Sequence, residues 1–117
     1  MTRIRIVING QDMTAKLDDT PVARDFASLL PMTLTLDDYA KKEKVSDLPK
    51  RLETQEAPAG YAPKAGDLTY YAPWGNLAIF YEGFSYSAGL VRLGEILGPH
   101  AALTFTGEAD ARFEIVD

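Results

Sequence analysis

The 117-residue sequence contains no cysteine and only one histidine. The absence of cysteine excludes disulfide bonds, thiolate metal ligands and cysteine nucleophiles. A single histidine excludes a site built from several imidazoles, the commonest zinc ligands besides thiolates. We therefore expect no cofactor and no bound metal.

Basic residues are too few to balance the acidic ones. Twelve Lys and Arg stand against 17 Asp and Glu, which gives a formal net charge of −5 at pH 7. An acidic domain repels phosphate backbones, so no nucleic-acid partner is expected. The lysines and arginines clustered between residues 41 and 51 are interleaved with Glu43 and Asp47. This pattern predicts a solvated segment of mixed charge.

Long hydrophobic runs are also missing. No stretch approaches the ~18 apolar residues that span a membrane as a helix. The first residues, MTRIRIVINGQ, alternate apolar and polar side chains instead of forming the apolar core of a signal peptide. These observations predict a cytoplasmic protein that does not partner a membrane.

The overall composition is that of an ordinary globular protein. Hydrophobic residues make up 46% of the sequence and charged residues 25%. A chain of this length buries about two-thirds of its unfolded surface and can form a core without disulfide bonds or a structural metal. We expect one domain over residues 1–117.

Alternating apolar residues predict β-strands along most of the chain. Ile4, Ile6 and Ile8 alternate with polar residues and are followed by Asn9-Gly10, which predicts a hairpin over residues 3–17. Further alternating segments lie at 32–36, 67–72, 76–82, 90–97, 103–106 and 113–115. About eight short sequential strands favour a mainly β fold, either an antiparallel barrel or a sandwich.

The periodicity changes to that of a helix between residues 20 and 30. Pro21 suits the first helical position, and Val22, Phe26 and Leu30 fall on one face. The pattern predicts one short amphipathic helix that covers an open end of the β structure.

Residues 38–65 differ from the rest of the chain. They contain Pro49, Pro58 and Pro63, most of the lysines and few large apolar residues. We expect a long loop here, with a short helical turn near 37–44 as an option.

Three stretches, in their order and spacing, resemble the cyclophilin-like fold. They are the N-terminal hairpin with TPVARDFASLLP, then GDLTYYAPWGNLAIFYE, then LVRLGEILG. The chain is most similar to the small prokaryotic cyclophilin-like proteins of unassigned function. The resemblance implies a closed antiparallel β-barrel of about eight strands, with one capping helix (20–30) and a long loop (38–65).

The resemblance to cyclophilins implies their fold, but this sequence lacks their catalytic residues. Cyclophilins are prolyl isomerases that bind an X-Pro segment in a shallow groove, where an arginine stabilises the twisted amide. The corresponding strand, 32–36, has no arginine. Phe80 falls near the family's proline-cup phenylalanine, and Phe84 and Tyr86 fall near its tryptophan.

More than half of the aromatic residues lie between residues 70 and 86. Some of them must face outward, because successive strand residues point to opposite faces. An exposed aromatic patch usually binds a partner or ligand, unless the helix at 20–30 and the long loop cover it. We therefore predict a binding module for an extended peptide, including a proline-containing one, or for a small apolar ligand. The predicted ligand-binding residues are Trp74, Phe80, Phe84 and Tyr86, with Arg92 at the rim.

Two alternatives remain open. In the first, the protein is a prolyl isomerase whose arginine has moved to Arg92, a weak catalytic candidate, or to Arg112. Arg92 has a structural interpretation as well, pairing with Glu82 or Glu95 across the strands. In the second alternative, the aromatic patch is the interface of a homodimer or larger oligomer.

Overall fold

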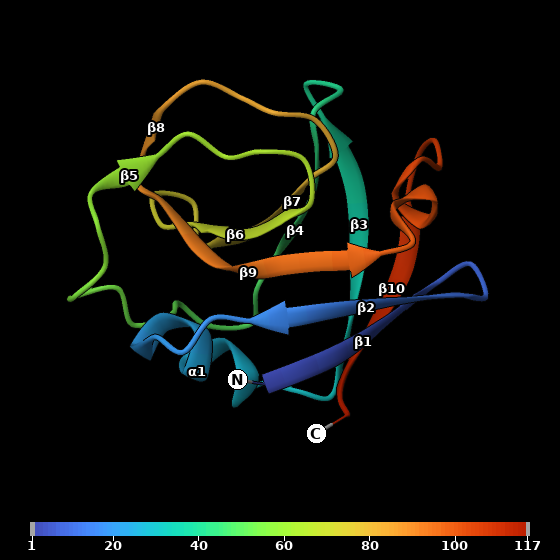
Figure 1. Ribbon diagram of the computed structural model, residues 1–117, viewed down its shortest axis with the longest axis horizontal. Helices are drawn as coiled ribbons and strands as arrows, with labels where there is room; N and C mark the ends of the chain where they lie inside the picture. The colour runs from blue at the N-terminus through green and yellow to red at the C-terminus, as the bar shows by residue number, and fades with distance from the viewer. Residues whose placement is uncertain (1, 117) are drawn as a thin grey trace.

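Eight antiparallel strands close into a barrel in the computed structural model, which describes residues 2–116 (Figure 1). The barrel strands are β1 (Thr2–Ile8), β2 (Gln11–Leu17), β3 (Met32–Tyr39), β4 (Glu43–Asp47), β6 (Asp67–Tyr71), β7 (Asn76–Phe80), β9 (Leu90–Gly98) and β10 (Ala109–Ile115). Their order around the barrel is β1-β10-β3-β4-β7-β6-β9-β2. The predicted eight-stranded antiparallel barrel is confirmed.

Side-chain alternation separates the interior of the barrel from its surface. Ile4, Ile6 and Ile8 of β1 are buried in the core, whereas the side chains between them point outward. β1 pairs with β2 on both sides of Asn9-Gly10, whose positive φ angles of 51° and 76° suit a tight hairpin turn. The predicted hairpin is therefore confirmed.

Helix α1 (Pro21–Ala27) packs on the core of the barrel. The Thr20 hydroxyl caps it by accepting a hydrogen bond from the Ala23 amide at 3.2 Å. Phe26 contacts Phe113 of β10 edge to face, with ring centroids 6.2 Å apart. The helix ends earlier than predicted, and residues 28–30 leave it as turns.

The predicted long loop over residues 38–65 needs correction. Strand β3 continues to Tyr39 and turns directly into β4, so the optional helical turn near 37–44 is instead a hairpin. A further short strand, β5 (Gly60–Tyr61), pairs with β8 (Ser87–Ala88) outside the barrel. The irregular part of the segment therefore shrinks mainly to residues 48–59.

Strand β4 escaped prediction because its inward-facing residue is a lysine. Lys44 is only 1% exposed, and its ammonium group donates to the Phe105 carbonyl at 2.7 Å. The same group lies 3.0 Å from a carboxylate oxygen of Asp38 and 4.0 Å from the centre of the Phe105 ring. A buried cation with these partners is satisfied, but in the sequence it looks like a solvated residue.

Residues 103–106 do not form the predicted strand. A 3-10 helix η1 (His100–Leu103) buries Leu103, and an irregular segment leads to β10. The Phe105 carbonyl in that segment is the acceptor for Lys44, so it is not available to a strand ladder. β4 takes the eighth place in the barrel instead.

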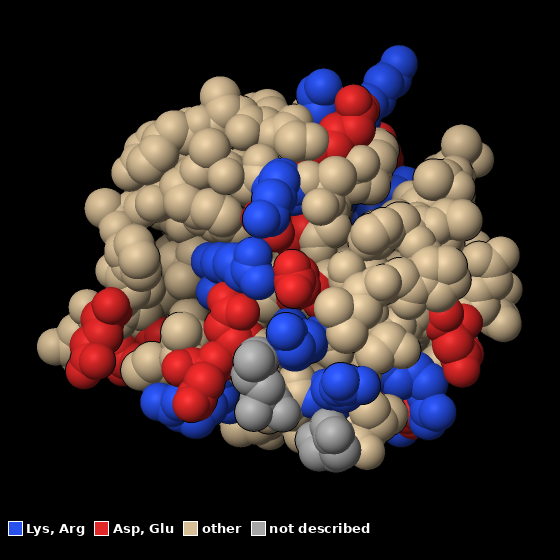
Figure 2. Space-filling model, viewed as in Figure 1, with Lys and Arg blue, Asp and Glu red and all other residues tan. Residues whose placement is uncertain are grey.

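A second, smaller hydrophobic cluster lies outside the barrel. It consists of Ala78, Phe80 and Leu90, with Val45, Tyr61 and Tyr71 packed against it. The paired strands β5 and β8 lie on this side of the barrel, beside β6 and β7 (Figure 1). The space-filling view shows mostly uncharged surface over this part of the molecule (Figure 2).

Closure of the barrel predicts a strict requirement for glycine at position 94. A Cβ on Gly94 of β9 would lie 2.2 Å from the Lys16 carbonyl oxygen and 2.8 Å from the Leu17 Cα of β2. These are backbone atoms, which cannot move aside as a side chain can. We expect Gly94→Ala to lower the free energy of unfolding by at least about 2 kcal/mol, measured by urea denaturation.

Gly83→Ala is the matched control for this substitution. A Cβ on Gly83 meets its nearest atom at 3.8 Å, an ordinary contact, so this variant should stay near wild-type stability. Equal losses in the two variants would show that the approach of β9 to β2 does not constrain the fold.

Candidate ligand-binding site

A groove of about 220 Å³ lies on the outer face of the barrel. We call it the aromatic groove, and its lining residues are Tyr39, Glu43, Val45, Tyr71, Trp74, Asn76, Phe80, Phe84, Ser87 and Leu90. Strands β3, β4, β6, β7, β8 and β9, the turn before β7 and the loop after it all contribute. Residues far apart in sequence therefore meet in one site.

Strand register explains why these side chains share a face. Glu43 of β4 stands opposite Tyr39 of β3 on one side and opposite Phe80 of β7 on the other. Tyr71 of β6 stands opposite Asn76 of β7. Because directly paired residues project to the same face of a sheet, both rows point outward into the groove.

The aromatic pair Tyr70-Tyr71 divides between the two faces of β6, as the alternation predicts. Tyr70 is buried in the barrel core, where its hydroxyl accepts a hydrogen bond from the Leu52 amide at 3.1 Å. Tyr71 packs against the outer cluster and lines the groove. Only the outward member is available to a ligand.

The aromatic rings form two groups along the groove. Trp74 is nearly perpendicular to Tyr71 and to Tyr39, with centroid distances of 5.3 and 5.9 Å. Phe80 and Phe84 form the second pair at 6.2 Å. Trp74, Tyr39 and Phe84 are 59%, 47% and 43% exposed, which is unusual for three large rings around one groove.

Two polar groups in the groove have no protein partner. The Glu43 carboxylate makes no hydrogen bond or ion pair with residues 2–116, and burial raises its pKa to about 7. Asn76 is 6% exposed, and its side-chain oxygen is buried without a hydrogen-bond partner. The Asn76 amide nitrogen donates to the Leu77 carbonyl at 3.2 Å, and this contact fixes which end of the amide is the oxygen.

The structure brings together three of the five residues predicted from the sequence. Trp74, Phe80 and Phe84 line the aromatic groove. Tyr86 is 61% exposed and does not line it. Arg92 faces a different pocket of the same outer surface.

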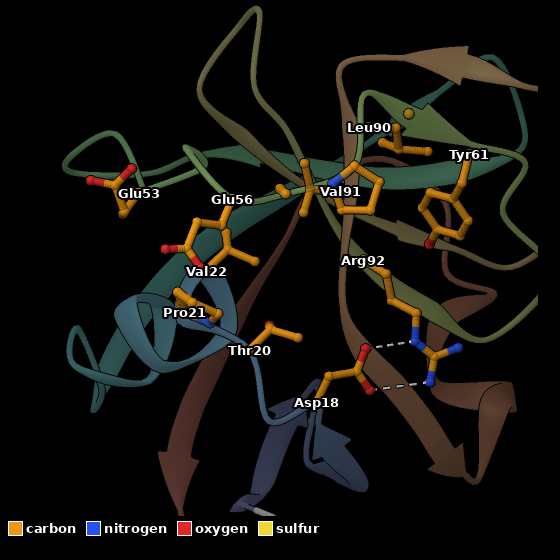
Figure 3. A pocket seen from close by; sticks show the side chains of 13 residues that line it. Asp18, Thr20, Pro21, Val22, Glu53, Glu56, Tyr61, Leu90, Val91 and Arg92 are labelled. Carbon is orange, nitrogen blue, oxygen red and sulfur yellow. Dashed lines mark hydrogen bonds and ion pairs between the residues drawn. The ribbon is translucent and has the colours of Figure 1, made fainter.

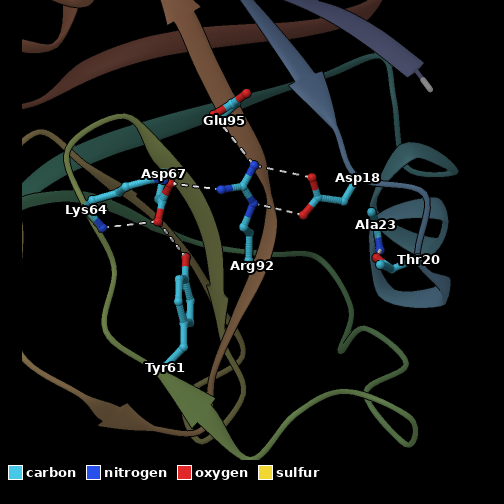
Figure 4. A network of polar contacts seen from close by, with 8 residues as sticks. All are labelled: Asp18, Thr20, Ala23, Tyr61, Lys64, Asp67, Arg92 and Glu95. Atoms are coloured by element: carbon cyan, nitrogen blue, oxygen red, sulfur yellow. Dashed lines mark hydrogen bonds and ion pairs between the residues drawn. The ribbon is translucent and has the colours of Figure 1, made fainter.

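Arg92 lies at the centre of a network of carboxylates (Figure 4). Its guanidinium contacts Asp18 at 2.9 and 3.4 Å, Asp67 at 3.4 Å and Glu95 at 3.6 Å. Burial disfavours the charge, but the hydrogen bond to Asp18 and the three negative charges outweigh it and raise the Arg92 pKa. The predicted pairing with Glu95 is present, whereas Glu82 pairs with Lys42 at 3.7 Å.

Asp67 extends this network to Tyr61. Its second carboxylate oxygen accepts a hydrogen bond from the Tyr61 hydroxyl at 3.1 Å and one from the Lys64 amide at 3.1 Å. Burial and the Asp67 charge raise the Tyr61 pKa well above its usual value. The tyrosine therefore stays neutral and acts as a hydrogen-bond donor.

A second pocket, of about 350 Å³, lies between α1, the 53–58 segment and β9 (Figure 3). Arg92, Asp18 and Tyr61 form part of its lining, together with apolar side chains such as Val22 and Val91. Leu90 lines both this pocket and the aromatic groove. The two sites therefore share one wall.

Sequence reasoning missed the polar residues of the groove. Glu43 fell in the presumed loop, and Asn76 began the predicted 76–82 strand without being singled out as a site residue. The available signal was the spacing of Glu43 and Val45, which places both on one face of a strand. Lys44 between them concealed that strand.

Within residues 2–116, the structure contains neither a cluster of metal-ligating side chains nor a membrane-spanning helix. No group of three or more His, Cys, Asp or Glu side chains there is arranged to hold a metal ion. No helix within the same range has the length and apolar character needed to cross a membrane.

Comparison with known proteins agrees with the barrel fold. The model of the cyclophilin-like family matches residues 6–115, so the chain belongs to that family. A hypothetical protein of Archaeoglobus fulgidus, solved in solution, has a similar fold with a TM-score of 0.67 and 16% identity. The match covers 97% of this chain and 93% of that one. No curated protein matches the sequence.

The Arg92 network predicts a stability role for this arginine. Asp67 is buried, and removal of Arg92 would leave its carboxylate without a counter-charge. We expect Arg92→Met to lower the free energy of unfolding by about 2 kcal/mol. The control is Arg112→Met, which breaks an exposed pair with Glu114 and should cost under about 1 kcal/mol. Similar denaturation midpoints for the two variants would contradict this role.

The raised pKa of Glu43 predicts a stability that falls with pH. The unfolded chain has the ordinary glutamate pKa near 4.5, whereas burial raises the folded value to about 7. Between these values the folded state binds more protons than the unfolded state, so stability is lost as pH rises. Solvent near this half-buried group reduces the effect to about 1 kcal/mol.

Replacement of Glu43 by glutamine should remove this loss. Glu43→Gln is expected to raise the melting temperature at pH 8.5 relative to wild type, with a smaller or opposite effect at pH 4. Glu108→Gln, at an exposed loop position, is the control and should show no such pH-dependent difference. A pH-independent effect of Glu43→Gln would argue against a desolvated carboxyl.

Proposed function

We propose that this protein is a binding module whose aromatic groove holds an extended peptide segment, including a proline-containing one, or a small apolar ligand. The observation that supports this most directly is the exposure of Trp74, Tyr39 and Phe84 around one groove. Covering such rings removes apolar surface from water, which favours association. Tryptophan and tyrosine are also the residues most often central to binding energy.

The size of the groove favours a small group over a large ligand. Its volume of about 220 Å³ is below the roughly 300–1,000 Å³ of sites for drug-sized molecules. A single side chain, a proline ring or a small fragment is an occupant of suitable size. A peptide would then place one residue in the groove and run along the barrel surface.

The isomerase alternative has weaker support than binding. It required an arginine at the groove, but Arg92 is held by Asp18, Asp67 and Glu95 beside another pocket. Arg112 lies on β10, pairs with Glu114 and does not line the groove. No side chain in the groove lining is an arginine. Membership of the family remains the basis for this alternative, and a fold alone does not imply an activity.

Fluorescence gives a direct test, because Trp74 is the sole tryptophan and lies in the groove. We expect its emission to shift on titration with a panel of X-Pro peptides and small apolar fragments. Phe84→Ala should weaken binding at least tenfold, since it removes one ring of the groove. Tyr86→Ala removes an exposed ring outside the lining and should leave affinity within about twofold.

Three other outcomes have distinct meanings. Accelerated cis/trans exchange of an X-Pro peptide in NMR would favour the isomerase alternative. A dimer in light scattering that Phe84→Glu dissociates would show that a second copy occupies the groove. If the folded protein shows no emission shift and no chemical-shift change in groove residues across the panel, the binding proposal is wrong.

A further inference from the structure

The aromatic groove contains two hydrogen-bond acceptors that no donor of the described residues satisfies. The Glu43 carboxylate and the buried Asn76 side-chain oxygen both lack partners. Buried polar groups are normally satisfied by the protein, by ordered water or by a ligand. An unpaired carboxylate in an apolar site favours an occupant that brings positive charge, with or without N–H groups.

No lysine or arginine of residues 2–116 pairs with this carboxylate. None of the residues that line the groove is a lysine or arginine. The cations adjacent to Glu43 in sequence are engaged elsewhere: Lys42 contacts Glu82, and Lys44 points into the barrel toward Phe105. Among residues 2–116, no cation is therefore placed to balance the charge of Glu43, which leaves that role open to a ligand.

The arrangement of the rings suits a cation as well. Trp74 forms near-perpendicular contacts with Tyr71 and Tyr39, at interplanar angles of 83° and 86°. Trp74 and Tyr39 keep much of their ring surface exposed at the groove, and aromatic faces attract ammonium groups. Glu43 stands directly opposite Tyr39 in the strand ladder, so carboxylate and rings belong to one site.

A neutral apolar ligand would fit this groove less well. It would cover Glu43, remove remaining water from the carboxylate and offer nothing in return. An ammonium group in the same place would pair with the carboxylate in a partly dehydrated setting, where such pairs gain strength. The charge of the site thus discriminates between two ligands of equal shape.

From these observations we propose that the aromatic groove is selective for a ligand that carries an alkylammonium group, either a primary or a methylated amine. The inference rests on the proposed binding function and adds the charge of the ligand to it. Glu43 would face the cation, and Trp74 and its neighbouring tyrosines would contact its methyl or methylene groups. The amine has two sources, a free small molecule or a lysine side chain of a peptide.

A pair of isosteric probes tests the charge directly. Choline carries a trimethylammonium group, and 3,3-dimethyl-1-butanol replaces it with a neutral tert-butyl group of the same shape. We expect calorimetry at pH 8, where the Glu43 carboxylate is ionised, to show at least tenfold tighter binding of choline. A capped peptide with trimethyl-lysine, compared with its norleucine analogue, distinguishes a peptide source from a free amine.

Two carboxylate variants assign the preference to the groove. Glu43→Gln should reduce the preference for choline to below threefold, because choline loses its counter-charge and the neutral probe no longer covers a carboxylate. Glu82→Gln, which removes an exposed carboxylate outside the lining, should retain the full preference. Thermal denaturation confirms that both variants are folded before titration.

The outcomes separate this inference from the binding function on which it rests. Equal affinity for the charged and neutral probes would overturn the cation preference and leave the apolar binding module standing. A preference that persists in Glu43→Gln would also overturn it, because the charge would then lie elsewhere. Binding of neither probe nor peptide by the folded protein would overturn both.

Discussion

The close approach of β9 to β2 is the constraint on which the rest of the structure depends. Gly94 leaves no side chain between the strands, so their backbones can pair and close the barrel. Strand β9 also pairs with β6 and carries Leu90 and Arg92 on its outer face. A barrel that failed to close here would leave β9 as an edge strand. Both the shared wall at Leu90 and the Arg92 network would then lose their support.

Closure also decides which residues remain for function. The inward side chains fill the core, and a closed barrel has no second sheet to cover its outer face. Phe80 and Leu90 are nevertheless buried, because the chain around β5 and β8 folds over part of that face. The cover stops short of Trp74 and Tyr39, which stay exposed beside the buried cluster. The groove is the boundary between the covered and the uncovered part of the outer surface.

Sequence reasoning succeeded where the signals are local. The alternation in β1 and the Asn9-Gly10 turn determine a hairpin within a few residues, and Pro21 marks the start of a helix. It failed at β4, where a buried lysine stands in the position usually taken by an apolar residue. Lys44 is stable inside only because Phe105, distant in sequence, supplies a carbonyl and Asp38, across the β3–β4 hairpin, supplies a charge.

In the candidate site, too, residues with local sequence signals could be predicted and residues defined by distant contacts could not. Its aromatic residues stand out because they are concentrated in one stretch of sequence. The neighbours of Glu43, by contrast, become visible only with the register of three strands, since Tyr39 and Phe80 flank it from β3 and β7. Arg92 and Glu43 lie on the same outer surface but differ in whether their charge is paired. The arginine is surrounded by carboxylates and serves the fold, whereas the glutamate is desolvated beside exposed rings without a partner. Such a group costs stability, and the charge it lacks is the one that a ligand could supply.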